Sequence, residues 1–456
     1  MSNAGWSRRE FVKAAASAAA VGGVGGYAGA RVRPPAAHSR LPVTPNASAA
    51  GAPNVGPLRI GLIGCGGRGT GAAVQALRAD NSTTLVAMGD VFSDRLESSL
   101  KGIMGELTEG DEAAASRIDV PPERRFVGFD AYQKVIDSGV DVVLLTTYPH
   151  FRPQHLAAAV AAGKHVFAEK PLAVDGPGVR SVIQSAAAAK TAGTALVVGF
   201  CWRYHDGMKA MFEQINGGAC GQIVSVHTTY HTDTLSKRAR KPGWSDMEFQ
   251  LRNWWHFTWA SGDHIVEQAV HSIDRLAWAM NDAMPVRVNC LGGRAARTGP
   301  ESGNAFDHFA AVYEYADGRR CFHTCRQIDS CPSDNSDYVY GTTGWAEVNG
   351  WTPRYVVRDH RGGELWKYSG RADRDMYQNE HDALFASIRS GTPINDGERG
   401  ASSTMMAIMA RMAAYTGKTV TWEQAMASKE RLGPESYELG ELETPGVAVP
   451  GRTKFF

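Results

Sequence analysis

The sequence predicts an α/β protein in which a doubly wound parallel sheet is followed by an α+β domain with an antiparallel sheet. From residue 58 to about residue 200, short apolar strands alternate with amphipathic helices. This alternation is typical of a parallel sheet with helices on both faces. From residue 285 onward, short strands follow one another with only turns between them, which is the spacing of an antiparallel sheet.

The bulk properties set limits on this architecture. At 456 residues the chain is too long for one hydrophobic core, so two domains are expected, 58–200 and 201–456. Lys and Arg number 48 against 47 Asp and Glu, and a net charge of +1 excludes the basic excess of a nucleic-acid-binding protein. The seven cysteines form no C-x-x-C pair, so neither a disulfide framework nor a metal site is expected.

Residues 1–30 resemble a twin-arginine export signal. Ser7 to Lys13 read SRREFVK, and an Ala/Gly/Val-rich run follows to a small-residue cleavage site at 28–30. The run is too short and too rich in glycine for a stable membrane anchor. We therefore expect an exported, periplasmic protein with the twin-arginine translocase as a partner. The alternative is an accidental arginine pair before an alanine-rich tail. Residues 31–57 contain six prolines and are predicted to be a linker arm.

A glycine-rich loop follows the first predicted strand, at 58–63, and precedes a helix that begins at Thr70. Glycines let backbone amides approach a pyrophosphate, and the helix N-terminus adds positive potential. A second strand, at 84–88, ends before an acid that can bind ribose hydroxyls. The predicted dinucleotide-binding residues are Gly64, Gly66, Gly67, Arg68, Gly69 and Asp90.

Asp90 also affects whether NAD or NADP is the preferred dinucleotide. The carboxylate of Asp90 would repel a 2′-phosphate, so NAD is favoured, although Arg68 and Arg95 keep NADP as an alternative. Further strands are predicted at 141–146, 164–168 and 195–199, with helices at 152–162 and 175–192 between them. The strand at 141–146 ends on the same edge as the glycine loop, so we expect three nearby residues to face the nicotinamide: Thr146, Tyr148 and His150.

The segment AAGKHVFAEKP ends a buried strand in an acid, a base and a proline, Glu169, Lys170 and Pro171. In open α/β sheets, ligands occupy the crevice beyond the carboxyl ends of the strands. Proline stops the strand and fixes the backbone, so the acid and the base are predicted to face the ligand. The alternative is a solvated salt bridge at a strand end.

One long helix is predicted from His264 to Asn281. Its apolar residues form one face, and a separate stripe contains Glu267, His271, Asp274 and Trp278. A carboxylate one turn from an imidazole would fix its tautomer and raise its basicity, making His271 a general base. The alternatives are a buried core histidine and a solvated helix face.

Aromatic residues precede this helix, with Trp254 and Trp255 next to polar groups. Such rings suit the C–H faces of a sugar, or they close a domain interface. The predicted substrate-binding residues are Trp202, Arg203, Tyr204, Trp254, Trp255 and Asp274.

Together, GCGGRG, AAGKHVFAEKP and the E-x-x-x-H-x-x-D helix resemble the glucose–fructose oxidoreductase/inositol dehydrogenase (Gfo/Idh/MocA) family over residues 58–420. The resemblance implies a Rossmann domain followed by a domain with an open-faced, mostly antiparallel sheet that often mediates homo-oligomers, dimers or tetramers. It implies that Glu169 contacts the nicotinamide ribose, that Lys170 contacts the reacting oxygen and that His271 is the catalytic histidine. Glu267 stands where many members have aspartate.

The implied reaction is the reversible oxidation of a secondary hydroxyl of a sugar, polyol or glycoside. Because free NAD is scarce outside the cytoplasm, an exported member is expected to hold its cofactor tightly. Redox-neutral glycoside cleavage is the first alternative. The second is a sugar-binding protein without turnover, although the presence of Lys170 and His271 argues against it.

Overall fold

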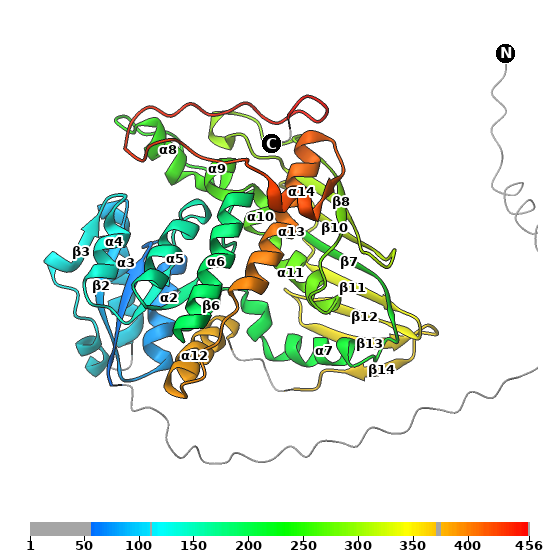
Figure 1. The fold of residues 1–456 in the computed structure, drawn as a ribbon, viewed down its shortest axis with the longest axis horizontal. Coiled ribbons are helices and arrows are strands. Elements are labelled where there is room, and N and C mark those ends of the chain that lie inside the picture. The colour runs from blue at the N-terminus through cyan, green and yellow to red at the C-terminus, as the bar shows by residue number, and fades with distance from the viewer. Residues whose placement is uncertain (1–55, 110–111, 371–374, 455–456) are drawn as a thin grey trace, which may run out of the picture. The chain divides into compact units, whose positions relative to one another are not determined.

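The computed structural model describes residues 56–109, 112–370 and 375–454, so the predicted export signal and nearly all of the predicted linker arm lie outside the described residues. The first sheet has six parallel strands in the order β3-β2-β1-β4-β5-β6 (Figure 1). This confirms the predicted doubly wound sheet, whose strand order reverses between β1 and β4. The strands are β1 (Leu58–Ile63), β2 (Thr83–Asp90), β3 (Arg125–Val127), β4 (Val142–Leu145), β5 (His165–Ala168) and β6 (Leu196–Val198).

Helices cover both faces of this parallel sheet. The apolar residues of α2 and α3 belong to one buried cluster and those of α4, α5 and α6 to another, because alternate strand residues point to opposite faces. The helices are α2 (Gly67–Ala79), α3 (Ser93–Thr108), α4 (Ala131–Asp137), α5 (Arg152–Ala161) and α6 (Gly176–Ala192). The short 3₁₀ helices among the described residues are Glu112–Arg117, Pro122–Arg124, Pro149–Phe151, Cys201–Tyr204, Trp254–His256 and Pro300–Ser302.

The second sheet has nine strands in the order β14-β13-β12-β11-β7-β10-β9-β8-β15. Only β7 and β10 pair in parallel, so the prediction of a mostly antiparallel sheet is confirmed. The strands are β7 (Ile223–Thr232), β8 (Arg287–Gly293), β9 (His308–Glu314), β10 (Arg320–Gln327), β11 (Ser336–Gly341), β12 (Gly344–Asn349), β13 (Arg354–Asp359), β14 (Glu364–Lys367) and β15 (Val420–Thr421).

Strand β12 was not predicted, although its burial alternates along its length. Its buried positions include Gly344 and Ala346, and such small side chains give a weak apolar signal. The helices of this half of the chain are α7 (Asp206–Asn216), α8 (Asp246–Arg252), α9 (Thr258–Ser261), α10 (His264–Glu267), α11 (Val270–Ala279), α12 (Met376–Arg389), α13 (Gly397–Thr416) and α14 (Trp422–Ala427).

The chain returns to the parallel sheet after completing most of the second one. Helix α12 packs against α2, and the ring of His381 lies 4.3 Å from that of Phe167 in β5. Asn395 then forms a parallel bridge to Leu196 at the edge strand β6. Residues from about 376 to 397 therefore complete the first domain, although they follow the second in sequence.

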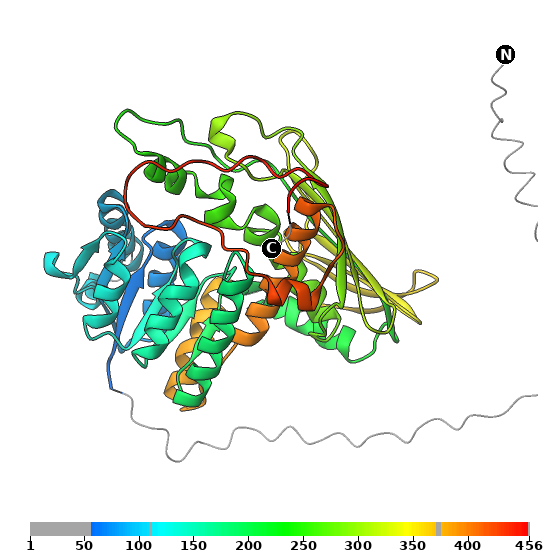
Figure 2. The same cartoon turned by 45° about the horizontal axis from the view of Figure 1, so that its top comes forward.

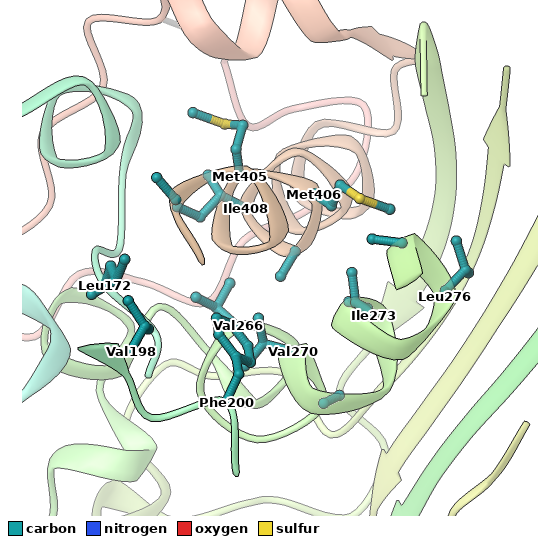
Figure 3. Packing of buried hydrophobic residues seen from close by; sticks show 14 of the residues in the cluster. Leu172, Val198, Phe200, Val266, Val270, Ile273, Leu276, Met405, Met406 and Ile408 are labelled. Atoms are coloured by element: carbon teal, nitrogen blue, oxygen red, sulfur yellow. The ribbon is translucent and has the colours of Figure 1, made fainter. Parts of the chain in front are cut away.

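Helix α13 lies between α6 and α11 and joins the two domains through a continuous core (Figures 1 and 3). Figure 3 shows Met405, Met406 and Ile408 on α13, which lies over Val266 and Val270, with Leu172 and Val198 of the nucleotide domain close by. Each such side chain contributes roughly 1.5–3 kcal/mol when fully buried. Because Leu172 follows Lys170 by two residues and Val270 precedes His271, this core fixes both candidate catalytic side chains.

Residues 428–454 follow α14 as an extended tail that runs across α8 and α9 (Figures 1 and 2). The tail carbonyl of Gly440 accepts a hydrogen bond from the amide of Met247, and that of Leu442 accepts one from the side chain of Gln250, at 3.1 and 2.8 Å. None of the described helices combines the length and the apolar character needed to cross a membrane.

Candidate functional site

The glycine-rich loop after β1 has the geometry of a dinucleotide cradle. Gly64 has a φ of +99°, and a Cβ there would lie 2.6 Å from the backbone of Thr146. A Cβ on Gly69 would overlap the carbonyl oxygen of Gly64, so helix and strand can pack this closely only with glycine. A Cβ on Gly66 or Gly67 would meet nothing within 4 Å, because both face the cavity. This open backbone at the N-terminus of α2 fits a pyrophosphate.

Asp90 ends β2 beside the cradle, as the motif predicts. Its carboxylate accepts hydrogen bonds from the amides of Cys65 and Phe92, at 2.6 and 2.9 Å. Burial raises the pKa of Asp90 despite these bonds. The carboxylate lines the cavity, where it can accept hydrogen bonds from the hydroxyls of an adenosine ribose.

A cavity of about 430 Å³ extends from this cradle to the second domain. It is lined at one end by the glycine loop and at the other by residues of β7, α10 and the segment around residue 254. Most of the predicted site residues line it: Gly64, Gly66, Gly67, Arg68, Gly69, Asp90, Thr146, Tyr148, Glu169, Lys170, Trp254, Trp255, Glu267 and His271.

Lys170 and Glu267 meet at the far end of the cavity. The Lys170 ammonium donates to the backbone carbonyl oxygen of Glu267 at 2.7 Å and lies 3.3 Å from its carboxylate. In a continuous helix that carbonyl would accept the amide of His271. Here the amide of His271 donates instead to Gln268, at 3.2 Å.

The single helix predicted for residues 264–281 is therefore wrong. The chain forms α10 and α11 with a break at residues 268–269, and the carbonyl freed by the break is the one that Lys170 binds. The Glu267 carboxylate also pairs with Lys170 rather than with His271, so the expected contact that would fix the tautomer of His271 is absent from the described residues.

His271 is buried at the cavity wall, and its Nδ1 has no hydrogen-bond partner among the described residues. Burial, with Lys170 and Arg275 nearby, lowers the pKa of His271 well below 6.5. This also corrects the expectation that a neighbouring carboxylate raises its basicity. The imidazole is neutral at physiological pH and able to accept a proton.

Glu169 is held by partners that the sequence did not predict. The guanidinium of Arg68 lies 3.0 Å from its carboxylate and packs over the ring of Tyr377, 4.8 Å from the centroid. Tyr377 comes from α12, more than 200 residues later in the chain, and lines the cavity. No local pattern could have indicated it.

The aromatic segment before α10 lines the cavity through two of its tryptophans. The rings of Trp254 and Trp255 lie 5.0 Å apart, and Tyr148 contacts Trp254 edge-on at 5.5 Å. These apolar faces are available to a ring-shaped ligand at the mouth of the cavity.

His150 does not line the cavity, which corrects its prediction as a cofactor contact. Its Nε2 hydrogen bonds to the hydroxyl of Tyr437 in the tail, at 2.7 Å, and burial lowers its pKa to about 4. The 3₁₀ turn after Tyr148 directs this side chain toward the tail and away from the cofactor cradle.

Four predicted substrate contacts are also corrected. Arg203 pairs with Asp274 at 2.8 Å and with Asp282 at 2.6 Å, so the first two form a buried ion pair outside the cavity. Tyr204 donates to Asp396 at 2.5 Å, and Trp202 packs under Arg275. These residues join the domains. The misleading signal was a position just after a sheet strand for Trp202, Arg203 and Tyr204, and a place on the polar helix stripe for Asp274.

Other residues that line the cavity were not predicted, among them Tyr132, Arg152, His155, Tyr230, Arg238, Arg252, Gln268 and Tyr377. Of these, Arg152 had a recognisable signal, because it follows a strand end on the cofactor edge. Within the described ranges, no group of three or more His, Cys, Asp or Glu could hold a metal ion.

Residues 58–200 match the family model described as "Oxidoreductase family, NAD-binding Rossmann fold", and residues 208–347 match "GFO/IDH/MocA C-terminal domain". Together the two models match more than half of the chain.

Two curated relatives and one solved structure illustrate the similarity. Inositol 2-dehydrogenase 3 of Saccharopolyspora erythraea is 28% identical over 226 residues, which cover 49% of this chain and 54% of the relative. The 2,7-anhydro-N-acetylneuraminate hydratase of Escherichia coli is 24% identical, covering 50% and 51%. The chain thus spans about half the length of these relatives. A levoglucosan dehydrogenase complexed with NADH and levoglucosan has a TM-score of 0.62 at 18% identity, covering 80% of this chain and 98% of that one.

Proposed function

Because the chain belongs to the Gfo/Idh/MocA oxidoreductase family, we propose that it is an NAD-dependent oxidoreductase acting on a secondary hydroxyl of a sugar, polyol or glycoside. The observation that carries this proposal is the meeting of Lys170, Glu267 and His271 in one cavity with the dinucleotide cradle. The names of the relatives support the substrate class, since they are inositol, anhydro-sugar and levoglucosan enzymes.

The residues of the cavity have different roles in the oxidation of an alcohol. NAD, which the glycine cradle and Asp90 would hold, would supply the hydride acceptor for the carbon that carries the hydroxyl. Lys170, anchored by Glu267, donates to the substrate oxygen and stabilises its developing negative charge. His271 is neutral and has an unpaired ring nitrogen, so it accepts the hydroxyl proton. Glu169 and Asp90 would accept hydrogen bonds from the two riboses of the cofactor.

Redox-neutral cleavage is the second candidate. One relative is named a hydratase, which adds water rather than performing a net oxidation. In such a cycle the hydride returns to the substrate after elimination from the oxidised sugar, so the cofactor shows no lasting change.

We also propose that the protein is exported by the twin-arginine route with its cofactor tightly bound, and that it forms homo-oligomers. The SRREFVK segment supports export, and fractionation of cells carrying Arg8→Lys with Arg9→Lys tests it. Loss of the protein from the periplasm is expected. Unchanged export would count against the signal.

The proposed activity is tested by the nicotinamide absorbance of purified protein, with NAD added if none copurifies, against a panel of sugars, polyols and glycosides. A rise in absorbance that a carbonyl substrate reverses is expected, and His271→Ala must abolish it. Cleavage of a glycoside without lasting absorbance change would favour the redox-neutral candidate. Tight binding predicts that the cofactor survives gel filtration.

A further inference from the structure

Arg152 is a buried cation at the cavity wall that forms no ion pair within the described residues. It is the first residue of α5, lines the cavity and is 4% exposed. One guanidinium nitrogen, Nη1, donates to the carbonyl oxygen of Pro171 at 2.5 Å. The Nε has no hydrogen-bond partner in the part of the chain that the structure describes.

Three other buried arginines are paired with acids, whereas Arg297 donates to the carbonyl oxygen of Phe306 and to the side-chain oxygen of Gln327. Arg203 lies 2.8 Å from Asp274, Arg411 lies 2.7 Å from Glu430, and Arg275 contacts Asp337. Such pairing is the rule, because a lone buried charge is costly. Burial lowers the pKa of Arg152 to about 10, so the side chain is still cationic at neutral pH.

The nearby carboxylates are already engaged. Glu169 pairs with Arg68 at 3.0 Å, and Glu267 pairs with Lys170 at 3.3 Å. Three cations, Arg68, Lys170 and Arg152, therefore share the two acids that line this end of the cavity, and Arg152 forms an ion pair with neither of them. A ligand that carries an oxyanion would complete the set.

We propose that Arg152 binds a carboxylate of the substrate, so that the preferred substrates are acidic sugars such as uronic or aldonic acids. This rests on the proposed function and narrows its substrate class. The planar guanidinium fork matches a carboxylate in geometry. Arg238, an exposed cation at the cavity wall, adds attraction for an anion.

The position of Arg152 favours the substrate over the cofactor as the source of this oxyanion. Its anchor, Pro171, directly follows Lys170, the residue proposed to bind the reacting oxygen. The pyrophosphate has its own cradle at Gly64–Gly69, where α2 begins. Trp254 and Trp255 offer apolar faces to the sugar ring.

The test compares substrates that differ only by the acid: glucuronate with glucose, galacturonate with galactose, and gluconate with glucitol. For at least one pair, kcat/KM is expected to be at least about tenfold higher for the acid, as one charge-assisted contact allows. In Arg152→Gln this ratio should fall toward one, and in Arg152→Lys it should fall only in part. Arg78→Gln, an exposed arginine on α2, is the matched control. Circular dichroism establishes that each variant is folded.

Other outcomes overturn the proposal. If kcat/KM is equal for acidic and neutral sugars, the carboxylate-binding role of Arg152 is refuted, but the proposed oxidoreductase function is not. A weaker Kd for NAD in Arg152→Gln with an unchanged substrate ratio would assign the oxyanion to the cofactor. An equal loss on acidic and neutral substrates would show that Arg152 only supports Pro171.

A binding measurement distinguishes failure of the proposed oxidoreductase function from failure of the carboxylate site. If no sugar in the panel reduces NAD, the intrinsic tryptophan fluorescence of the protein with NAD is titrated with glucuronate and with glucose. Saturable quenching by glucuronate alone, lost in Arg152→Gln, would support the carboxylate site without turnover. If neither sugar quenches the fluorescence, or if both quench it equally, the carboxylate site is refuted.

Discussion

Lys170 is the residue on which most of the site depends. Its ammonium contacts both the backbone carbonyl and the carboxylate of Glu267, and it lowers the pKa of the nearby His271 together with burial and Arg275. One side chain thus links the nucleotide domain to the α10–α11 break and sets the charge around the proton acceptor.

Removing the Lys170 ammonium should lower the rate of the reaction without weakening the binding of NAD. We expect Lys170→Ala and His271→Ala to lower kcat by about 10²–10⁴-fold, the range for a lost proton-transfer or charge-stabilising group. The Kd for NAD, measured by calorimetry, should change little because the cradle is untouched. Lys164→Ala, outside the cavity, is the control. Full activity in either variant would refute the assigned roles.

The pH dependence of activity follows from His271. The imidazole must be deprotonated to accept a proton, so activity falls as pH drops through its pKa. Because that pKa lies well below 6.5, the midpoint of the fall in kcat/KM on the acid side of the pH profile should also lie below pH 6.5. A midpoint at 6.5 or higher, measured with a slow substrate, would contradict the role of a buried, neutral His271.

At the scale of elements, the β1–α2 turn and the α10–α11 break position the ligands. The turn depends on glycine at Gly64 and Gly69, where a side chain would meet backbone. The break depends on contacts from outside the segment, since Lys170 binds the Glu267 carbonyl and Gln327 bonds to Gln268 at 2.5 Å.

Gly69→Ala should disrupt the turn. Its Cβ would overlap the Gly64 carbonyl, and such overpacking costs about 1–3 kcal/mol of unfolding free energy. NAD affinity should fall with it, because helix and strand must separate at the cradle. Gly105→Ala, on the exposed side of α3 with nothing near its Cβ, should instead be neutral or stabilise the protein by up to about 1 kcal/mol. Denaturant unfolding and NAD titration of both variants compare them directly. Equal stability and affinity would contradict the geometry.

At the scale of the whole molecule, contacts remote in sequence close the site. The tail holds the segment around residues 246–256 through Gly440 and Leu442 and reaches the nucleotide domain through Tyr437 and His150. The wall that carries Trp254 and Trp255 is therefore stabilised by the last part of the described chain.

Ending the chain after Pro434 should loosen that wall. Because the hydrogen bonds of Tyr437, Gly440 and Leu442 are lost, amide exchange in residues 246–256 should become faster and Tm should fall. A chain ending after Thr444 keeps these contacts and serves as the control. Identical exchange in both truncated chains would show that the tail does not support this segment.

The outer face of the second sheet supports the proposed homo-oligomer. Leu291, Phe322 and Tyr340 share this face by strand register and are 72%, 40% and 44% exposed. Exposed apolar side chains gathered on one face are typical of protein interfaces. Phe322→Lys combined with Leu291→Lys should reduce the mass measured by light scattering toward one chain, whereas Arg78→Gln should not. A monomeric wild-type protein would rule out the oligomer.

The sequence by itself determined the parallel sheet, the glycine cradle, Asp90 and the Glu169-Lys170 pair. These features arise from short-range requirements, such as strand periodicity, glycine at a positive φ and an acid or base where a strand stops. Each can be recognised within about ten residues of chain, so the prediction needed no knowledge of distant contacts.

Only the tertiary structure decided which polar residues face the cavity. Arg203 and Asp274 neutralise each other in the interior, and His150 turns to Tyr437. Tyr377 and Arg152 enter the site instead, because α12 returns to the parallel sheet and the acids near Arg152 already have partners. A buried charge is satisfied by whichever partner the fold brings near, and that choice depends on long-range packing.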